Sequence, residues 1–351
     1  MKEKKNTAIV CLSPNSGGME IDTLKLAKKL NPYMNIILIS KKNTFISKEA
    51  KIMNNIISKE VHFKSSLSIS LIIQIRKIIK EQNIKNFIFF GASELKSIYF
   101  SILGLSINLI VRHGTTKTRP KKDWFHKLIY SDVNYHVSIC KHLKNNVEYI
   151  IPFGKQSKSV LIYSSVKSFD FIKQHNKKLV LLHTGRICEG KGQIDAIKAC
   201  DILVKKDIDF IFFIVGGYEK KFKNKFLKFY ESIPYKNKIK LVGFSNEIEE
   251  YLKKSDVYLF PSYGEGLSNS FLEAISAKLK CISYKNTSFT ELKELGLSFE
   301  LVEDKNIDKL QEALIKIATK EITYDIKNNQ KIINQIFSET TEVKNYLEIL
   351  K

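Results

Sequence analysis

Two glutamates on either side of a short glycine-containing loop are the residues with the clearest chemical potential. Glu265 and Glu273 are eight residues apart. The apolar run Val257–Phe260 before them predicts a strand, and Phe271–Ala277 predicts a helix that contains the second glutamate. The start of a helix presents backbone N–H groups and a positive dipole end to an anion, and a carboxylate accepts hydrogen bonds from paired hydroxyls. This segment therefore predicts a site for a phosphorylated, hydroxyl-rich ligand such as a nucleotide sugar rather than for a metal ion.

A second loop adds positive charge to the predicted chemistry. The strand Lys178–His183 is followed by a glycine-rich turn that contains Arg186 and Lys191, and a helix is expected from Gln193. A guanidinium group binds phosphate through two parallel hydrogen bonds, and an ammonium group adds a compact positive charge. Together these two side chains would neutralise a diphosphate, including one that departs as a leaving group.

Similar glycine-containing loops follow predicted strands along most of the chain. They are Ser13–Glu20, Arg112–Gly114, Val215–Gly217 and Val242–Phe244. With the two loops above, and in this order, they resemble the family-4 retaining glycosyltransferases of GT-B fold, also named glycosyl transferases group 1. The Glu265/Glu273 pair is the specific part of the resemblance, whereas the amino-terminal Gly-Gly loop alone is a weak signal.

The elements that must position these loops follow a regular rhythm. Apolar runs of strand length alternate with helical patterns, which predicts an α/β fold with parallel sheets. In the first half the expected strands are Ala8–Leu12, Ile36–Ile39, Phe87–Phe90, Asn108–Val111 and Val133–Val137. In the second half they are Leu179–His183, Phe210–Val215, Lys240–Val242, Val257–Phe260 and Lys280–Ser283. The resemblance implies the GT-B arrangement, two facing doubly wound Rossmann-like domains with ligands in a cleft at the carboxyl ends of the strands.

The length of 351 residues fits two domains of about 150–200 residues each. We expect residues 1–165 to form an amino-terminal, acceptor-binding Rossmann-like domain and residues 166–323 a nucleotide-sugar-binding one. Residues 324–351 are expected to form carboxyl-terminal helices that cross back to the first domain. The hinge is placed near residues 164–177.

The resemblance also implies roles for individual residues. Glu273 would accept the ribose hydroxyls of the donor, and Glu265 would contact the transferred sugar. Glu265, His113, Arg186 and Lys191 form the expected catalytic set. The expected donor-binding set is Gly17, Gly18, Arg186, Lys191, Gly217, Phe244, Glu265, Gly266, Leu267, Ser268, Asn269 and Glu273. The helix that contains Glu273 is expected to begin with Ser268 or Asn269 as its N-cap.

Structural alternatives stay open for several of these residues. Glu265 could stabilise its own loop, His113 could be a core histidine satisfied by the backbone, and Phe244 could pack in the core. His183, at the end of its strand, is expected to be structural. One departure from the family pattern is plain, because Lys278 and Lys280 stand where the family usually has a glycine and then a proline. The turn from helix to strand must therefore form without glycine.

The composition limits the class of protein. Hydrophobic residues make up 44% of the chain, as in a globular protein, and no apolar run approaches the roughly 20 residues of a spanning helix. The first predicted strand begins close to Met1, so no signal peptide is expected. The five cysteines are scattered, which indicates reduced thiols and a cytoplasmic location. Cys140 and His142 are close in sequence but lack further ligands, so no metal site is expected.

The net charge of +22 has two interpretations. Lysine outnumbers arginine 54 to 4, a pattern that A/T-rich coding could produce without selection for binding. Alternatively, a basic face could bind anionic lipid, which would place the protein peripherally on the inner face of the cytoplasmic membrane. The residues assigned to this acceptor or membrane side are Arg112, Lys117, Arg119, Lys121, Lys122 and Trp124.

The function that these patterns and the resemblance imply is a retaining, metal-independent hexosyl transfer. A hexose or N-acetylhexosamine would move from a nucleotide sugar, with UDP as the expected carrier, to a growing glycan. The expected acceptor is a lipid-linked oligosaccharide, a lipopolysaccharide or a capsule precursor. No cofactor and no nucleic-acid partner are expected. The alternatives are another GT-B enzyme, such as a phosphorylase or a nucleotide-sugar epimerase, or a non-enzymatic basic protein that binds membrane or nucleic acid.

Overall fold

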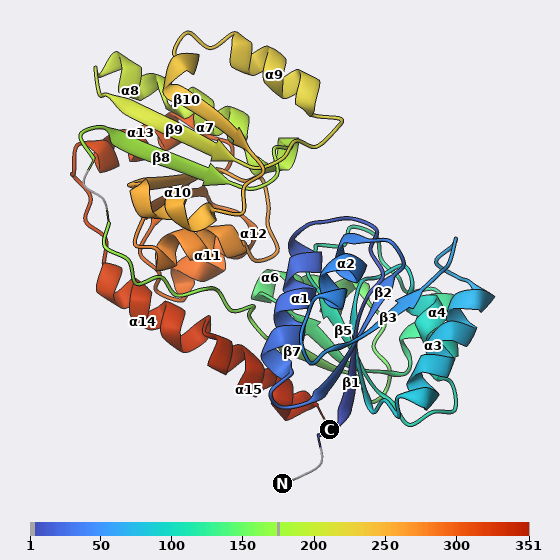
Figure 1. The fold of residues 1–351 in the computed structure, drawn as a ribbon. Helices are drawn as coiled ribbons and strands as arrows, with labels where there is room; N and C mark the ends of the chain where they lie inside the picture. The colour runs from blue at the N-terminus through green and yellow to red at the C-terminus, as the bar shows by residue number, and fades with distance from the viewer. Residues whose placement is uncertain (1–3, 174–175, 351) are drawn as a thin grey trace. The chain divides into compact units, whose positions relative to one another are not determined.

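The computed structural model describes residues 4–173 and 176–350, so residues 174–175 of the predicted hinge lie outside the described residues. The chain divides into two compact units (Figure 1). The first unit comprises Met1–Ser164 and Glu339–Lys351, and the second comprises Ser165–Ser338. Within the terminal segment 324–351, the helix α14 (Ile326–Ile336) thus falls in the second unit and α15 (Glu339–Ile349) in the first.

The first unit is built on a parallel sheet with the strand order β3-β2-β1-β4-β5-β6-β7. Its strands are β1 (Asn6–Cys11), β2 (Asn35–Lys41), β3 (Ile57–Val61), β4 (Asn86–Phe90), β5 (Asn108–His113), β6 (Val133–Ser138) and β7 (Lys158–Leu161). Its other helices are α1 (Gly18–Leu30), α2 (Phe45–Lys51), α3 (Ile69–Glu81), α4 (Leu95–Ile102), α5 (Trp124–Tyr130) and α6 (Lys141–Ile150).

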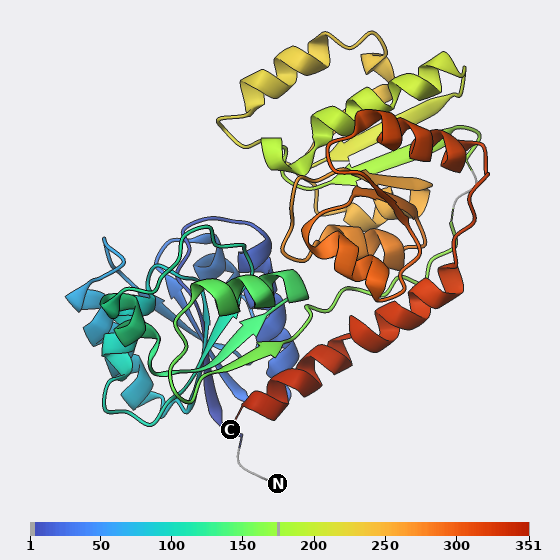
Figure 2. The same cartoon turned by 180° about the vertical axis from the view of Figure 1, so that it is seen from behind.

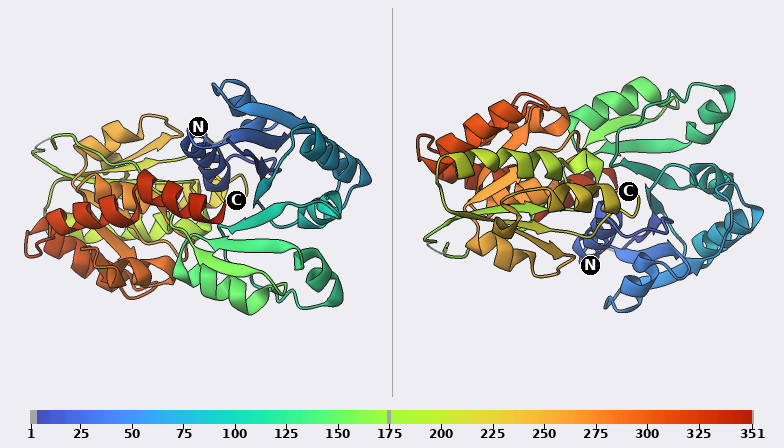
Figure 3. Two further views of the ribbon diagram at one scale, coloured as in Figure 1. Left: turned by 90° about the horizontal axis from the view of Figure 1, so that it is seen from below. Right: turned by 90° about the horizontal axis from the view of Figure 1, so that it is seen from above.

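Helices cover both faces of this sheet because its central strands are apolar on both sides. In β1, Ala8 and Val10 pack in a core with α3 and α4, whereas Ile9 and Cys11 pack in a second core with α1, α2 and α15. Both views of Figure 3 show α1 (blue) and α3 (cyan) on opposite sides of the sheet. Burial on both faces explains why these strands have continuous apolar runs instead of alternating ones.

The last helix, α15, is held in the first unit by contacts with segments from the beginning of the chain. It lies beside α1 in Figure 2. Lys29 of α1 forms an ion pair with Glu342 at 2.7 Å, and the Asn108 side chain donates a hydrogen bond of 2.8 Å to the carbonyl of Ile349. The Lys29–Glu342 pair is largely buried, so it fixes the position of α15 more firmly than an exposed pair would.

The second unit repeats the same construction with the strand order β10-β9-β8-β11-β12-β13, again all parallel. Its strands are β8 (Leu179–Thr184), β9 (Phe210–Val215), β10 (Ile239–Gly243), β11 (Val257–Phe260), β12 (Lys280–Tyr284) and β13 (Glu300–Val302). Its helices before α14 are α7 (Gln193–Ala199), α8 (Asp201–Lys205), α9 (Lys223–Glu231), α10 (Ile248–Lys254), α11 (Asn269–Ser276), α12 (Thr287–Glu294) and α13 (Ile307–Ala318).

The predicted α/β class with two doubly wound parallel sheets is confirmed, and all ten expected strands are present within one or two residues. Three strands escaped prediction, namely β3, β7 and β13. All three lie at the edge of a sheet. An edge strand has only one neighbour to pair with, so it can be short or polar, as the Ser-Lys-Glu centre of β3 illustrates.

The turn that follows α11 is made by a lysine in the left-handed region. Lys278 has φ +63° at the end of this helix, where such a conformation usually requires glycine. Its N–H donates to the carbonyl of Ile275, and the next N–H, of Leu279, donates to Ala274. The sequence departure at this position is therefore met by strain in the lysine backbone, and the turn keeps its shape.

Replacing Lys278 with glycine should raise the free energy of unfolding by up to about 1 kcal/mol, because it removes a left-handed non-glycine residue. Urea denaturation of the full chain would measure the change. Lys280→Gly is the matched control, since Lys280 begins β12 with extended backbone and a glycine there should destabilise. An increase at both positions, or at neither, would contradict the strain assigned to Lys278.

Candidate functional site

The loops at the carboxyl ends of β8, β9 and β10 are joined by backbone hydrogen bonds beyond the strands themselves. The N–H of Ile187 donates to the carbonyl of Gly217 at 2.8 Å, and the N–H of Gly216 donates to the carbonyl of Gly243 at 2.8 Å. A Cβ atom on Gly216 would lie 1.9 Å from the carbonyl oxygen of Gly185. Glycine is therefore required for the close approach of two of these loops, which form one rigid edge of the sheet.

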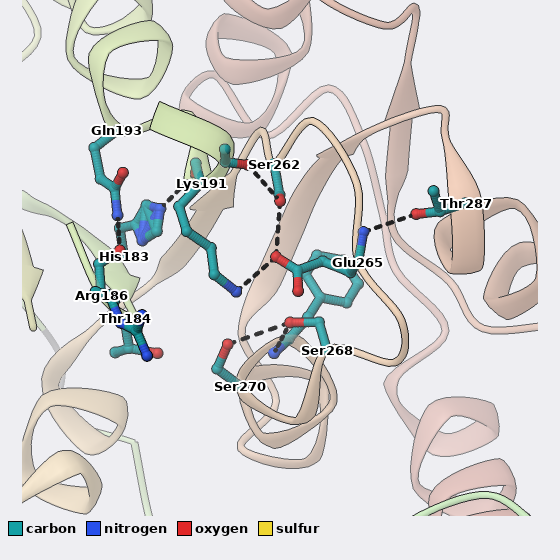
Figure 4. Close-up of polar contacts among 12 residues, drawn as sticks. His183, Thr184, Arg186, Lys191, Gln193, Ser262, Glu265, Ser268, Ser270 and Thr287 are labelled. Atoms are coloured by element: carbon teal, nitrogen blue, oxygen red, sulfur yellow. Dashed lines mark hydrogen bonds and ion pairs between the residues drawn. The ribbon is translucent and has the colours of Figure 1, made fainter. Parts of the chain in front are cut away.

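Glu265 is held by side chains from two different loops. Lys191 Nζ lies 2.6 Å from Glu265 Oε1, and the Ser262 hydroxyl donates to the same oxygen at 2.7 Å. The backbone N–H of Glu265 donates to the Thr287 hydroxyl at 3.0 Å. Figure 4 shows Lys191 and Ser262 converging on the carboxylate. The loop after β8 and the loop after β11 therefore bring an ammonium and a carboxylate together, as the sequence predicted for one site.

The charges of this pair are partly shielded from water. The side chain of Lys191 is 27% exposed and that of Glu265 is 14% exposed. The ammonium also lies 5.2 Å from the ring centre of Phe260, a favourable position for a cation. Because both groups are partly buried, their interaction with a charged ligand is stronger than it would be on an open surface.

The His183 ring contacts the backbone carbonyl of Lys191. The ring is fully buried, and its Nε2 lies 3.0 Å from the carbonyl oxygen of Lys191. Burial, with the nearby Lys191 charge, lowers the pKa of His183 to about 3, so the ring is neutral and its Nε2–H donates to that carbonyl. The expected structural role of His183 agrees with this arrangement.

The helix α11 begins beside Glu265. Ser268 is its N-cap and accepts a hydrogen bond of 3.4 Å from the N–H of Phe271, while Asn269 is the first helical residue. Ser268 was one of the two predicted caps. Glu273 lies in the second turn and is half-buried. The start of α11 thus lies three residues after Glu265, and Glu273 belongs to the same helix.

Arg186 and Phe244 also follow strands at this edge of the sheet. The carbonyl of Arg186 accepts a hydrogen bond of 2.9 Å from Gln193, whereas its side chain is exposed. Phe244, just after β10, is 78% exposed, which excludes the alternative of a packed core phenylalanine. An exposed aromatic ring and an exposed guanidinium are both available to a ligand.

In the first unit, the predicted site residues differ in how accessible they are. Gly17 is the N-cap of α1 and Gly18 its first residue, and a Cβ atom on Gly18 would meet no heavy atom within 4 Å. Arg112 is only 5% exposed, pairs with Asp22 at 2.8 Å and donates to the Ser164 hydroxyl at 2.6 Å. Arg112 thus lies in an internal ion pair and not on an open acceptor or membrane face.

The remaining residues assigned to the acceptor or membrane side are more accessible. Arg119, Lys122 and Trp124 are exposed, and Lys117 and Lys121 are half-buried. His113 is almost fully buried, and its two ring nitrogens contact Lys117 Nζ at 2.8 Å and His136 Nδ1 at 3.0 Å. The structure thus places His113 in the core, with side chains as its partners where the sequence alternative expected backbone.

Several residues that complete these contacts were not predicted. Ser262, Thr287, Asp22 and His136 carry no motif of their own, and they reach their partners only through the fold. Ser262 alone had a usable signal, because it lies three residues before Glu265 at the end of a predicted strand.

The described residues contain no group of three or more His, Cys, Asp or Glu side chains that could hold a metal ion. No helix among residues 4–173 and 176–350 is long and apolar enough to span a bilayer.

Comparison with known proteins relates this geometry to a family. Residues 166–336 match the family model of glycosyl transferases group 1. The chain is 28% identical over 159 residues to UDP-Gal:alpha-D-GlcNAc-diphosphoundecaprenol alpha-1,3-galactosyltransferase of Escherichia coli, covering 44% of this chain and 41% of that protein. It is 24% identical over 313 residues to the capsular polysaccharide biosynthesis glycosyltransferase CapH of Staphylococcus aureus, covering 82% of this chain and 84% of that protein.

A solved structure extends the similarity to the whole fold. HepE of Anabaena, in complex with UDP-glucose, superposes with a TM-score of 0.80 at 16% identity, covering 98% of this chain and 99% of that chain. The match includes both sheets. Residues 166–336, within the second unit, thus form a glycosyl transferases group 1 domain, the protein is a transferase enzyme, and its two doubly wound parallel sheets have the GT-B fold.

Proposed function

We propose that the protein is a retaining, metal-independent glycosyltransferase that uses a UDP-linked hexose or N-acetylhexosamine as donor. The observation that carries this proposal is the convergence of Lys191, Glu265 and the start of α11 at one edge of the second unit. Arg186 follows a neighbouring strand at the same edge. The structure of HepE was solved with UDP-glucose, which supports a uridine nucleotide as donor.

In this proposal the donor diphosphate binds to positive groups of the second unit. Arg186 and Lys191 supply full charges, and the N–H groups at the start of α11 supply partial ones. Lys191 is held by Glu265 and the N–H groups by the helix backbone before the reaction, so these groups stabilise the negative charge that develops when the diphosphate leaves. Because the protein side chains supply this charge, the proposed reaction requires no metal ion.

Glu265 has one oxygen available to the transferred sugar. The contacts described for its carboxylate, from Lys191 and Ser262, both go to Oε1. Oε2 could therefore accept a hydrogen bond from a sugar hydroxyl without breaking either contact. Glu273, in the second turn of α11, would accept hydrogen bonds from the ribose hydroxyls. The exposed ring of Phe244 would stack on the base.

We further propose that the acceptor hydroxyl attacks from the face that the diphosphate leaves. The leaving phosphate would accept the proton of that hydroxyl, and attack from this face retains the anomeric configuration.

The proposed acceptor is a growing glycan on a lipid, a lipopolysaccharide or a capsule precursor. The curated relatives act in such syntheses by their names, one on a diphosphoundecaprenol-linked sugar and one in capsular polysaccharide biosynthesis. A cytoplasmic enzyme on the inner face of an anionic membrane would reach these acceptors, and the exposed Trp124 with its neighbouring lysines is the proposed contact.

The experiment that tests the proposed function is a screen of UDP-sugars by thermal shift and mass spectrometry, followed by two variants. Arg186→Ala and Glu273→Ala should each lower donor affinity or turnover at least tenfold, about 1.4 kcal/mol, and leave the circular dichroism spectrum unchanged. Lys198→Ala is the control, since Lys198 is an exposed residue on α7 outside the proposed site. EDTA should leave turnover nearly unchanged.

The same assay separates the alternatives. A phosphorylase would require inorganic phosphate, and an epimerase would convert the nucleotide sugar without an acceptor. Wild-type transfer by both variants would remove the assigned residues from the site. Complete loss with EDTA and recovery with manganese would contradict the metal-independent mechanism.

A further inference from the structure

The loop between β5 and α5 in the first unit is fastened to α6 at three points. The Thr116 hydroxyl lies 3.1 Å from His142 Nε2. Asn146 binds the backbone of Lys117 twice, accepting from its N–H at 2.8 Å and donating to its carbonyl at 2.9 Å. The N–H of Lys121 donates to the carbonyl of Ile150 at 3.0 Å. The loop therefore presents its side chains from a fixed backbone.

Two buried histidines, His113 and His136, lie next to Lys117 of this loop. An ammonium group can only donate hydrogen bonds, so Lys117 donates to His113 Nδ1. His113 must then carry its proton on Nε2 and donate it to His136 Nδ1. Burial, followed by the charge of Lys117, lowers the pKa of both rings, that of His136 to about 3. Both imidazole rings are therefore neutral and provide no counter-ion for Lys117.

Three half-buried lysines lie on this loop and on α4, and Lys121 is close enough for its charge to act on Lys117 and for that of Lys96 to act on Lys121. Lys117 and Lys121 belong to the loop, and Lys96 belongs to α4. Among the described residues, none of the three forms an ion pair with Asp or Glu, in contrast to Lys29 and Lys191. Burial and the proximity of Lys121 lower the pKa of Lys117 to about 8, and burial and the proximity of Lys96 lower that of Lys121.

Three like charges in a partly buried place repel each other, and an anion that binds among them would relieve the repulsion. A single carboxylate would leave most of this charge uncompensated, whereas a phosphate or diphosphate carries two or more negative charges and several acceptor oxygens. Lysine ammonium groups are suited to phosphate as point charges on mobile stems. The cluster thus matches a phosphate-bearing ligand in charge and in chemistry.

We propose that Lys96, Lys117 and Lys121, all in the first unit, bind the phosphate or diphosphate group of the acceptor. This inference rests on the proposed function, because it assigns the second substrate of the same transfer. It also specifies the acceptor class, namely a glycan carried on a phosphate or diphosphate. Lys117 binds with its position set by His113, and Lys121 binds from the fixed loop.

The test uses the full-length protein saturated with UDP, so that the donor site is occupied, and titrates inorganic pyrophosphate by calorimetry. Trp124, the single tryptophan, follows Lys121 by three residues and gives a second readout by fluorescence. Lys117→Met and Lys121→Met should each weaken pyrophosphate binding at least fivefold and leave UDP binding unchanged. Lys121→Met keeps the Lys117–His113 contact, so it tests the site without disturbing the core. Lys127→Met, an exposed lysine of α5, is the matched control and should bind as the wild type does.

The dependence on pH provides a readout that a purely structural role would not change. The groups that face Lys117 are His113, His136 and Lys121, with Lys96 and His142 on the neighbouring helices. Since the pKa of Lys117 lies near 8, the advantage of the wild type over Lys117→Met should shrink between pH 7 and pH 9. Comparing the two proteins at each pH cancels the ionisation of pyrophosphate itself.

A vesicle arm separates the two sources of phosphate. If a lipid headgroup binds at the site, sedimentation of the protein with phosphatidylglycerol vesicles should be reduced in Lys117→Met and Lys121→Met, and also by added pyrophosphate. If the site binds only the phosphate of the acceptor, sedimentation should be unchanged in both cases. Pyrophosphate binding that is absent from the wild type, or equal in all variants, would overturn the inference. Absence of UDP binding would instead contradict the proposed function, and the pyrophosphate titration would still decide on the lysine site.

Discussion

Replacing Lys191 with methionine should lower sugar transfer by about a hundredfold or more, the largest catalytic effect expected in this chain. Lys191 is the half-buried ammonium that contacts Glu265 at 2.6 Å. In the proposed mechanism its charge faces the departing diphosphate, and removal of one preorganised group of this kind typically costs about 10²–10³ in turnover. Methionine keeps the length and the apolar stem, so packing against Phe260 is largely preserved.

The loss of turnover has to be separated from a loss of folding. Without Lys191, the carboxylate of Glu265 keeps only the Ser262 hydroxyl as a described side-chain partner, and we expect a destabilisation of about 1–2 kcal/mol, discounted for its residual exposure. Lys225→Met is the matched control. Lys225 pairs with Glu189 of the same loop, but both side chains are exposed, so stability and turnover should change little. Equal turnover in the wild type and Lys191→Met would remove Lys191 from the catalytic set.

The sequence was sufficient to predict the central strands and the loops that follow them. Buried central strands such as β4 and β11 are continuous apolar runs, and the glycines after them mark where the chain must turn. The motif residues Lys191 and Glu265 could be placed in one site because parallel strands bring their carboxyl ends to the same edge of a sheet. The structure places these two side chains in direct contact.

Contacts between residues without a motif could not be predicted in this way. Thr287 supports the backbone of Glu265 from 22 residues further along the chain, and Asp22 neutralises Arg112 across 90 residues. Arg112 illustrates the limit clearly. The sequence assigned Arg112 to the acceptor or membrane side, but the structure shows that its guanidinium forms an ion pair with the internal carboxylate of Asp22.

The largest effect on stability is expected from Gly192→Ala. Gly192 follows Lys191, has φ +68° and is the N-cap of α7. A Cβ atom there would lie 1.8 Å from the carbonyl oxygen of Pro261, at the end of β11. Alanine in the left-handed region costs about 1–2 kcal/mol by itself, and the clash forces the two loops apart. We expect the free energy of unfolding of the second unit to fall by about 2–4 kcal/mol, within the range of severe single substitutions.

The same displacement should reach the active residues, because these loops are also joined by hydrogen bonds. The Tyr263 N–H donates to the carbonyl of Gly190 at 2.9 Å, and the Ser262 hydroxyl oxygen lies 3.0 Å from the same carbonyl oxygen. Gly190→Ala is the matched control two residues away, since a Cβ atom there would meet nothing within 4 Å. Thermal unfolding should show a decrease of roughly 5–15 °C for Gly192→Ala, at about 2–4 °C per kcal/mol for a unit of this size, and little change for Gly190→Ala. Turnover measured well below the melting temperature should also fall for Gly192→Ala, because Lys191 and Glu265 lie on the two loops that the added methyl group separates. If Gly192→Ala instead melts and transfers sugar like Gly190→Ala, the close approach of these loops does not hold the site together.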